Sequence, residues 1–280
     1  MDKWLLSKLN TVIQAVDDNL GNYRIPEAAR ALDEFVDDMS NWYVRRSRER
    51  FWAKGMEQDK INAYMTLYTA LVEICKCAAP MVPFMTEEIY QNLVRSIDKT
   101  APERIHLCDF PTVNEAHIDK ELEKNMDEVL KIVVMGRACR NAANIKNRQP
   151  IGNMFVKAPF ALSEFYKEII EDELNVKNVS FTDDVSSYTS YTFKPQLRTV
   201  GPKYGNYLGQ IQKALAGLDG NKAMAELKAN GVLTLPEVSE DVKLAEEDLL
   251  ITMTQMEGYV TEGDNPVTVV LDTNLTPELV

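Results

Sequence analysis

The sequence predicts an α-helical bundle over residues 1–150, followed by a smaller α+β domain over residues 151–280. Apolar residues recur three and four positions apart through the first part, which is the spacing of amphipathic helices. Short runs of β-forming residues, separated by turn residues, occupy the second part. The change between the two patterns falls at Arg148-Gln149-Pro150, so we place the domain boundary there.

Five helices are expected in the first part, each bounded by glycine, proline or a capping residue. The first helix ends at Gly21-Asn22, the second runs from Pro26 to about Lys54, and the third runs from about Asp59 to Ala79. The fourth starts at a Thr86 cap, and the fifth runs from about Asp119 to Asn147. Amphipathic helices with short connections are typical of an antiparallel bundle. Gly136, in the last of them, is expected to permit close approach of another backbone.

The second part is expected to form a small mixed or antiparallel sheet with helices between its strands. The expected strands are Phe155–Lys157, Val176–Phe181, Tyr188–Phe193, Leu249–Met256 and Val267–Leu271. Helices are expected at about Ser163–Glu173 and Tyr204–Asn230. The last residues, Leu275-Thr276-Pro277-Glu278, read like the start of a further helix, so we expect this domain to be truncated at its C-terminal end.

Charge and cysteine usage narrow the class of protein. The net charge is −12, but the acidic excess lies in the second part, and the basic residues are clustered in the first. A local basic patch still binds RNA, because salt screens charges beyond about 8–10 Å. No apolar run approaches the roughly 20 residues that cross a bilayer. The cysteines lack paired spacing, which favours a reducing cytosol and argues against a zinc site: Cys75, Cys77, Cys108 and Cys139.

Four arginines and four aromatic residues fall between Asn41 and Trp52. Guanidinium groups bind phosphates and rings stack unpaired bases, so this composition is typical of RNA binding. The apolar stripe of the helix meets Trp42 or Tyr43 and then Arg46 and Arg50, for which partial burial and pairing with carboxylates is the simpler interpretation. The opposite side carries the better candidates for phosphate and base contacts, Arg45, Arg48 and Trp52, and Lys54 at the end of the helix is a further candidate for a phosphate contact. Their alternative role is a solvated face with Glu49 and Asp38 as weak partners.

A second basic cluster lies late in the last helix of the bundle. Arg137 and Arg140 extend the apolar stripe of that helix, so a structural role competes with RNA binding for both. Lys146 and Arg148 are expected at the helix end. There they either bind phosphates or simply compensate the negative end of the helix dipole, which stabilises by about 0.3–1 kcal/mol.

The sequence offers no catalytic constellation. The only histidines, His106 and His117, lie in or beside a loop rich in helix breakers, and neither accompanies a nucleophile. The segment Gly201-Pro202-Lys203-Tyr204-Gly205 reads as a turn and lacks the spacing of a phosphate-binding loop. We therefore expect no enzymatic activity, no metal and no cofactor in this chain alone.

Several segments, in collinear order, resemble isoleucyl-tRNA synthetases of the class I aminoacyl-tRNA synthetase family. The opening Asp2-Lys3-Trp4-Leu5-Leu6-Ser7-Lys8-Leu9-Asn10, the Asn41–Trp52 helix and the corner Ala79–Tyr90 are similar to the family's helical anticodon-binding domain. Ile145–Ile151 resembles the junction after the bundle in the eukaryote-like branch. The later segments resemble that branch's C-terminal extension: Glu173–Lys177, Gly201–Gly205 and Leu271–Glu278.

This resemblance implies the anticodon stem-loop-binding portion of a cytoplasmic, monomeric ligase of protein biosynthesis. The full-length ligase would use ATP with Mg²⁺, with zinc possible elsewhere in that longer protein. Its signatures His-Ile-Gly-His and Lys-Met-Ser-Lys-Ser are absent from this sequence. The implied partners are tRNA for isoleucine and the catalytic and editing domains of the same polypeptide, with no membrane.

Three other interpretations stay open from the sequence. A valyl- or leucyl-tRNA synthetase shares the bundle, although Trp42-Tyr43-Val44-Arg45-Arg46 and the C-terminal extension favour the isoleucyl enzyme. A scaffold module would use the arginine-rich helix to dock a catalytic domain without touching RNA. An enzyme in its own right would need a nucleophile and base or a metal-ligand spacing that the sequence does not show.

Overall fold

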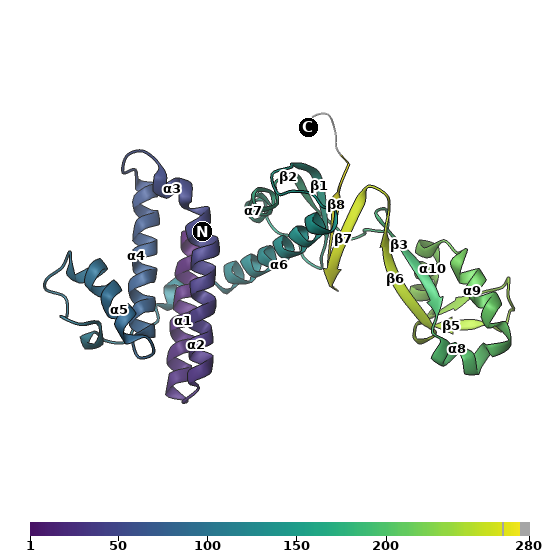
Figure 1. Ribbon diagram of the computed structural model, residues 1–280, viewed down its shortest axis with the longest axis horizontal. Helices are drawn as coiled ribbons and strands as arrows, with labels where there is room; N and C mark the ends of the chain where they lie inside the picture. The colour runs from purple at the N-terminus through teal and green to yellow at the C-terminus, as the bar shows by residue number, and fades with distance from the viewer. Residues whose placement is uncertain (265, 275–280) are drawn as a thin grey trace. The chain divides into compact units, whose positions relative to one another are not determined.

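The computed structural model describes residues 1–264 and 266–274. The chain divides into two compact units, Met1–Asn125 and Met126–Val280, and each is described by itself (Figure 1). The helix expected to begin at Leu275-Thr276-Pro277-Glu278 lies outside the described residues. The bundle followed by an α+β part, as the sequence predicts, is confirmed.

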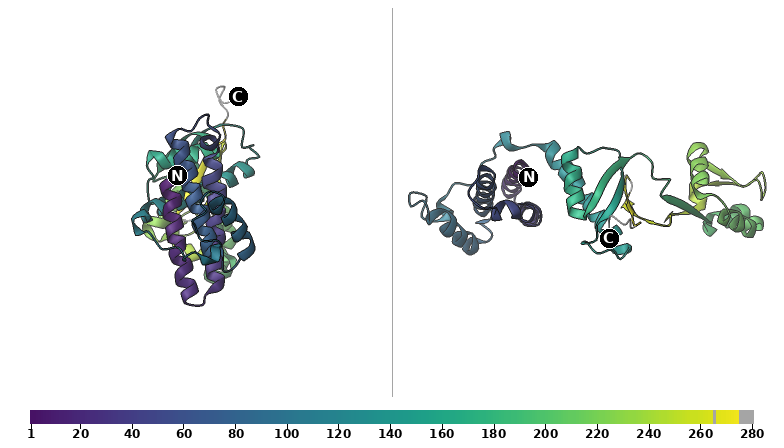
Figure 2. Two further views of the ribbon diagram at one scale, coloured as in Figure 1. Left: turned by 90° about the vertical axis from the view of Figure 1, so that its left-hand side faces the viewer. Right: turned by 90° about the horizontal axis from the view of Figure 1, so that it is seen from above.

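The first unit is helical. Its α-helices are α1 (Asp2–Gly21), α2 (Ile25–Asp38), α3 (Arg48–Trp52), α4 (Gln58–Ala78) and α5 (Pro83–Tyr90). Helices α1, α2 and α4 pack along one another (Figures 1 and 2). The large side chains of their predicted apolar stripes form the core, with Trp4, Leu5 and Phe35 among the most deeply buried. Burial of these stripes accounts for most of the helical stability, because isolated helices of this length are marginal in water.

The second predicted helix runs on past Asp38 but changes its geometry. Met39–Val44 is a π-helical segment, and the chain then breaks at Ser47 before α3. A π turn is wider than an α turn and rotates less per residue, so two successive side chains can face the core. Trp42 and Tyr43 are therefore both buried, where the helical spacing left the choice between them open.

Two other predicted helix ends are wrong. Helix α5 begins at Pro83, whose missing N–H suits a first-turn position, and the Thr86 hydroxyl donates to the Val82 carbonyl from inside the helix. Helix α6 (Lys120–Ala142) stops five residues before Asn147, because Asn144 adopts a left-handed conformation (φ 54°).

The boundary between the two compact units falls inside α6, between Asn125 and Met126. The later part of α6 packs within the second unit, where the Cys139 thiol lies 3.9 Å from the Val269 carbonyl. Gly136 faces a side chain and not a backbone: a Cβ added there would lie 2.3 Å from Leu174 Cδ1. The change of sequence pattern marks where the helical residues end. The boundary between the packed units lies earlier, where α6 stops packing against the first unit and starts packing within the second.

The second unit contains a mixed four-stranded sheet in the order β2-β1-β8-β7. The strands are β1 (Ile151–Lys157), β2 (Val176–Thr182), β7 (Tyr259–Asp264) and β8 (Val267–Asp272), and α7 (Glu164–Leu174) connects the parallel pair β1 and β2. The pairs β1–β8 and β8–β7 are antiparallel. Strand β7 was not predicted, because its β-formers are confined to Tyr259-Val260-Thr261 and are followed at once by Glu262-Gly263-Asp264, which are residues typical of turns.

The remaining strands of this unit pair in two ribbons packed with three helices. Strand β3 (Thr189–Pro195) pairs with β6 (Leu249–Gln255), and β4 (Val232–Thr234) pairs with β5 (Lys243–Ala245). The single helix expected at Tyr204–Asn230 is divided into α9 (Leu208–Ala216) and α10 (Gly220–Asn230), and a further helix that was not expected, α8 (Leu197–Tyr204), precedes them. The expected turn from Gly201 is also wrong, because Pro202 lies inside α8. The three-residue strands β4 and β5 are too short for a periodic signal.

Candidate nucleic-acid interface

Four of the predicted contact residues lie in the segment that follows α2. Arg45, Arg48, Trp52 and Lys54 are all exposed, and Trp52 keeps 75% of its surface open to solvent. An indole so exposed contributes little to the core, and large apolar side chains left in water often mark an interaction site. Arg45, Arg48 and Trp52 are therefore exposed as the helical spacing indicates, and Lys54 is exposed in the loop that follows α3.

Each of the two arginines on this face lies over a tryptophan ring. The Arg48 guanidinium carbon is 5.4 Å from the Trp52 ring centroid, and that of Arg45 is 5.7 Å from the Trp42 centroid. Stacking of Arg48 on the Trp52 ring is compatible with binding of a phosphate oxygen at the N–H edge of its guanidinium. Arg45 also donates through Nε to the Asn41 carbonyl at 2.8 Å, which restrains its stem. The arrangement offers restrained positive charge beside an open ring surface.

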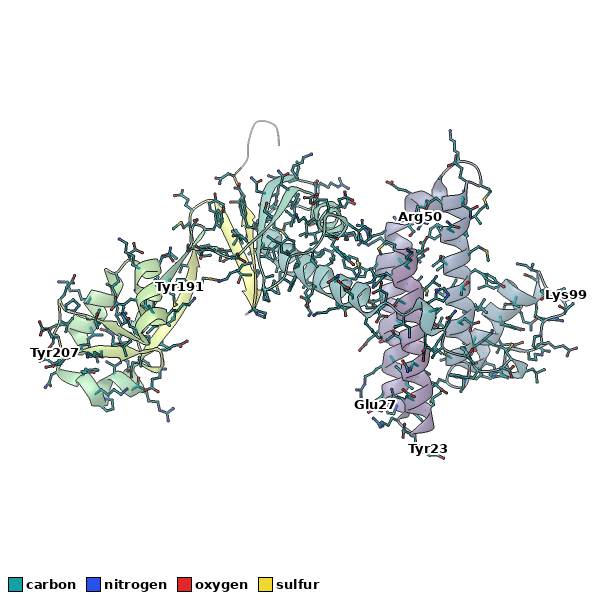
Figure 3. The ribbon with its side chains drawn as sticks, turned by 180° about the vertical axis from the view of Figure 1, so that it is seen from behind. Tyr23, Glu27, Arg50, Lys99, Tyr191 and Tyr207 are labelled. Atoms are coloured by element: carbon teal, nitrogen blue, oxygen red, sulfur yellow. The ribbon has the colours of Figure 1, made fainter. Side chains whose placement is uncertain are left out.

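Arg50 holds this segment to the bundle, as its place on the apolar stripe predicts. Arg50, labelled in Figure 3, donates to both carboxylate oxygens of Asp2, at 2.7 and 2.9 Å, and to both of Asp59, at 2.8 Å each. Two carboxylates from different helices thus converge on one planar guanidinium, which suits such bidentate pairing. The Tyr43 hydroxyl also donates to Asp2 at 2.7 Å. Arg50 therefore has a structural role.

The other two stripe residues are also turned inward. Trp42 is buried to 8% exposure and Arg46 is half-buried. Asp38, considered as a weak partner of the outer arginines, accepts from Lys8 Nζ at 3.0 Å. Farther along, Lys60 Nζ donates to the Ala53 carbonyl at 2.7 Å, which anchors the chain next to Lys54. The exposed side chains thus project from a segment fixed at several points.

The Asp2 carboxylate makes the stability of this unit dependent on pH. Hydrogen bonds from Arg50 lower the pKa of Asp2, burial opposes them, and the Tyr43 hydroxyl lowers the pKa further. A depressed folded-state pKa adds stability above the unfolded pKa of about 4, and this stability is lost as the pH falls through the folded pKa. We expect Asp2→Asn to lower the free energy of unfolding by about 1–3 kcal/mol at pH 7, and by progressively less below about pH 4.

Urea unfolding followed by tryptophan fluorescence measures this effect in the first unit alone, because Trp4, Trp42 and Trp52 are the three tryptophans of the chain. Asp18→Asn is the control: Asp18 is exposed on α1, and its substitution should change the free energy by less than about 0.5 kcal/mol. A deficit of Asp2→Asn that stayed constant from pH 7 to pH 3 would contradict the assignment.

The second basic cluster separates into inward and outward residues. Arg137 pairs with Glu173 at 2.9 Å, and Arg140 is 1% exposed and donates to backbone carbonyls. Lys146 and Arg148 do not lie at the helix end, as expected, but in a turn beyond it, because α6 stops at Ala142. Both are exposed. They belong to the second unit, whereas Arg45, Arg48, Trp52 and Lys54 belong to the first.

The sequence does not single out the partners that fix these residues. Asp2 and Asp59, which hold Arg50, look like ordinary helix-start acids in the sequence. Asn175 follows α7 in a left-handed conformation (φ 49°) and donates to the turn that carries Lys146 and Arg148. An asparagine directly before a β-forming run is a recognisable signal for such a helix end.

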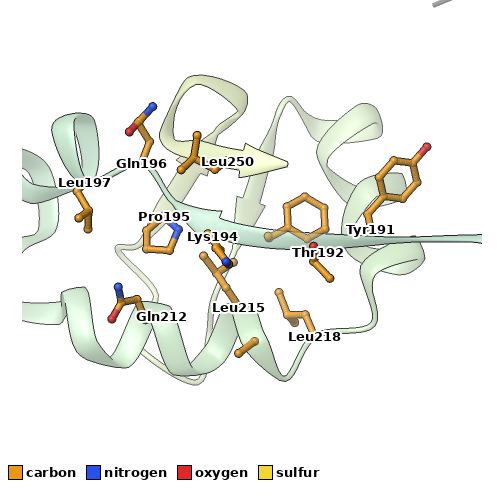
Figure 4. Close-up of a pocket in the computed structure, with 12 residues that line it drawn as sticks. Tyr191, Thr192, Lys194, Pro195, Gln196, Leu197, Gln212, Leu215, Leu218 and Leu250 are labelled. Carbon is orange, nitrogen blue, oxygen red and sulfur yellow. The ribbon is translucent and has the colours of Figure 1, made fainter. Parts of the chain in front are cut away.

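One surface pocket borders the turn that carries Lys146 and Arg148, with Ile145 and Gln149 in its lining. One cavity of about 640 Å³ lies in the second unit between β3 and α9, lined by Tyr191, Pro195, Leu215, Leu218 and Leu250 among others (Figure 4). Its lining is largely aliphatic and aromatic, and Lys194 adds a charged side chain to its wall.

Across residues 1–264 and 266–274, no cluster of three potential metal ligands occurs. Over the same residues, no helix combines the length and apolarity of a membrane span.

A helical bundle with exposed arginines, one of them beside the exposed Trp52 ring, fits the class of RNA-binding domains, and comparison with known families agrees. Residues 2–155 match the family described as the anticodon-binding domain of tRNA ligase. The chain belongs to this family.

Among curated proteins, the chain is similar throughout its length to isoleucine–tRNA ligases. It is 48% identical to that of Clostridium tetani (strain Massachusetts / E88), 46% to that of Clostridium kluyveri and 37% to that of Chlamydia abortus. Each comparison covers 100% of this chain and 27% of the relative. The chain thus spans about a quarter of the length of these relatives. The similarity supports the isoleucyl interpretation over the valyl and leucyl ones.

Proposed function

We propose that this chain is the anticodon stem-loop-binding portion of an isoleucine–tRNA ligase. Arg45, Arg48 and Lys54 bind phosphates of the loop, and Trp52 stacks an unpaired base. The observation that carries the proposal is the Arg48–Trp52 pair, in which a guanidinium lies 5.4 Å from a ring that is 75% exposed. Restrained charge and an open ring match the two needs of a single-stranded RNA loop, phosphate neutralisation and base stacking.

In this proposal the chain contributes binding and orientation and performs no bond-making step. Lys146 and Arg148, in the second unit, bind further phosphates of the same tRNA. Energy from these contacts selects the tRNA for isoleucine and holds its acceptor end for catalytic and editing domains of the same polypeptide. ATP and Mg²⁺ act in that catalytic domain. The whole ligase is a monomer.

A salt titration tests the proposal with two RNAs: an isoleucine tRNA transcript, and the same transcript with an altered anticodon. Phosphate neutralisation predicts that the logarithm of the affinity falls linearly with the logarithm of the salt concentration for both. Loss of base-specific stacking and hydrogen bonds predicts about 10-fold weaker binding of the altered transcript across the titration.

Two outcomes would contradict the proposal. Equal affinity for the two transcripts at every salt concentration would leave only non-specific attraction. Absence of binding to either transcript would favour the scaffold role, in which the exposed arginine face docks a catalytic domain and never contacts RNA.

A further inference from the structure

The turn formed by residues 146–149 is held by side chains at every one of its backbone carbonyls. Arg140 Nη1 donates to the carbonyls of Lys146 and Gln149, at 2.9 and 3.0 Å. Asn175 Nδ2 donates to the two carbonyls between them, those of Asn147 and Arg148, at 3.2 and 3.1 Å. The turn is also closed on itself, because the Gln149 N–H donates to the Lys146 carbonyl at 3.0 Å. Exposed turns rarely need so many anchors, since water satisfies their carbonyls equally well.

Arg140 connects this turn to the end of α7. Its Nε donates to the Leu174 carbonyl at 2.8 Å, and its Nη2 donates to the carbonyls of Leu174 and Asn175. These are carbonyls at a helix C-terminus, where the helix dipole is negative, so they stabilise a positive group. Burial lowers the pKa of Arg140, but a guanidinium stays charged at physiological pH. The buried cation therefore fixes the spacing between the turn and α7.

Asn175 connects the same turn to the sheet. It occupies the left-handed position after α7, and its carbonyl accepts from the Ile151 N–H at 3.0 Å, where β1 begins. Arg140 and Asn175 also contact each other, through Arg140 Nη2 and the Asn175 carbonyl at 3.0 Å. The two residues thus form one network that reaches a helix, a strand and the turn.

The network leaves the charged side chains of the turn exposed to solvent. With the carbonyls occupied from within, the exposed side chains of Lys146 and Arg148 carry the only positive charges of the four-residue turn. A ligand that binds a mobile loop must order it, at a cost in conformational entropy, whereas a fixed turn has already lost that freedom. The anchors are therefore more numerous than folding of an exposed turn requires, and they favour tight binding of a ligand by these two side chains.

We infer that Arg140 and Asn175 are positioning residues, which preorganise the 146–149 turn so that Lys146 and Arg148 bind phosphates of the tRNA. The inference rests on the proposed function and adds to it the residues that act through this turn. Neither Arg140 nor Asn175 contacts RNA. Arg140, considered from the sequence as a possible RNA contact, instead contributes through the backbone that it holds.

The test combines Asn175→Gly with removal of the basic side chains. Glycine accepts the positive φ of residue 175 without strain, so this substitution removes the two amide hydrogen bonds while preserving the backbone. We expect Asn175→Gly to weaken binding of the isoleucine tRNA transcript about 3- to 10-fold in the unaltered chain. In a chain that already carries Lys146→Ala and Arg148→Ala, the same substitution should change affinity by less than about 2-fold, because nothing is left to position.

Thermal unfolding separates positioning from a merely structural role. The melting temperature should fall equally when Asn175→Gly is introduced into either background, whereas the loss of affinity should appear in one background only. Asn221→Ala is the matched control, since the Asn221 amide also donates to two carbonyls of the same unit, those of Ser186 and Thr189, at 2.9 and 3.0 Å. It should lower the melting temperature without changing tRNA affinity. Arg140→Lys, which keeps the charge but loses the planar fork, should reproduce the effect of Asn175→Gly.

The outcomes distinguish this inference from the proposed function. If Lys146→Ala with Arg148→Ala leaves tRNA affinity unchanged, the turn is not a phosphate contact and both assignments fail at this turn. If that pair weakens binding but Asn175→Gly and Arg140→Lys do not, the turn binds RNA without needing its anchors, and the inference fails while the proposed function stands. Equal losses of affinity from Asn175→Gly in the two backgrounds would also overturn the inference.

Discussion

Replacing Arg45 and Arg48 together by glutamate is expected to weaken binding of an isoleucine tRNA transcript by on the order of 10- to 100-fold near physiological salt. Both guanidinium groups are exposed and stacked on indoles, so the substitution places two negative charges where the RNA backbone is expected. The slope of log affinity against log salt should become shallower by up to about 0.7–0.9 for each phosphate that is no longer neutralised. Fluorescence anisotropy with a labelled transcript, repeated over a range of salt concentrations, measures both quantities.

The control for this charge reversal is a second pair of exposed arginines in the same unit. Arg24→Glu with Arg30→Glu makes the same change in net charge at the start of α2, away from the exposed tryptophan. We expect it to weaken binding only slightly, through long-range repulsion that salt screens. Equal losses from the two pairs would show that general charge governs binding, and the Arg45–Arg48–Trp52 face would no longer qualify as the RNA contact.

The helices of the first unit could be predicted from sequence because their buried residues recur with the period of an α-helix. The buried faces of α1 and α2 follow the predicted stripes, except that Val36, which the helical spacing also places on the stripe of α2, is 43% exposed. Arg50 lies at the end of such a stripe and pairs with carboxylates as expected. The π-helical segment Met39–Val44 could not be predicted, because its residue types also occur in ordinary α-helices. It buries Trp42 and Tyr43 together and still leaves Arg45 and Arg48 outside.

The candidate site was only partly predictable because its fixed geometry depends on contacts between distant residues. Spacing along a helix identifies which arginines face outward, but it does not reveal that Asn175 lies against residues 147 and 148. The same limit applies to Arg140, whose position on an apolar stripe indicates burial but not the carbonyls that it meets. Short strands such as β4 and β5 are equally invisible, because their pairing and not their composition defines them.

The largest loss of stability is expected from Gly220→Ala in the second unit. Gly220 begins α10, and a Cβ added there would lie 1.7 Å from the Tyr191 carbonyl oxygen and 2.6 Å from its carbon. Both are backbone atoms of β3, so no rotamer change relieves the overlap and the helix or the strand must move. The movement would also disturb the neighbouring Asn221, whose amide donates to the Thr189 carbonyl on the same strand. We expect the free energy of unfolding to fall by about 3 kcal/mol or more.

Amide hydrogen exchange over residues 189–256 measures this loss where it arises, and β3 should exchange faster. The tryptophan-detected unfolding of the first unit should stay unchanged, because all three tryptophans precede residue 126. Gly209→Ala is the matched control: Gly209 lies in α9, no atom lies within 4 Å of an added Cβ, and alanine should stabilise by about 0.5–1 kcal/mol. If Gly220→Ala proved as harmless as Gly209→Ala, α10 would not approach β3 at Gly220 as closely as the structure places it.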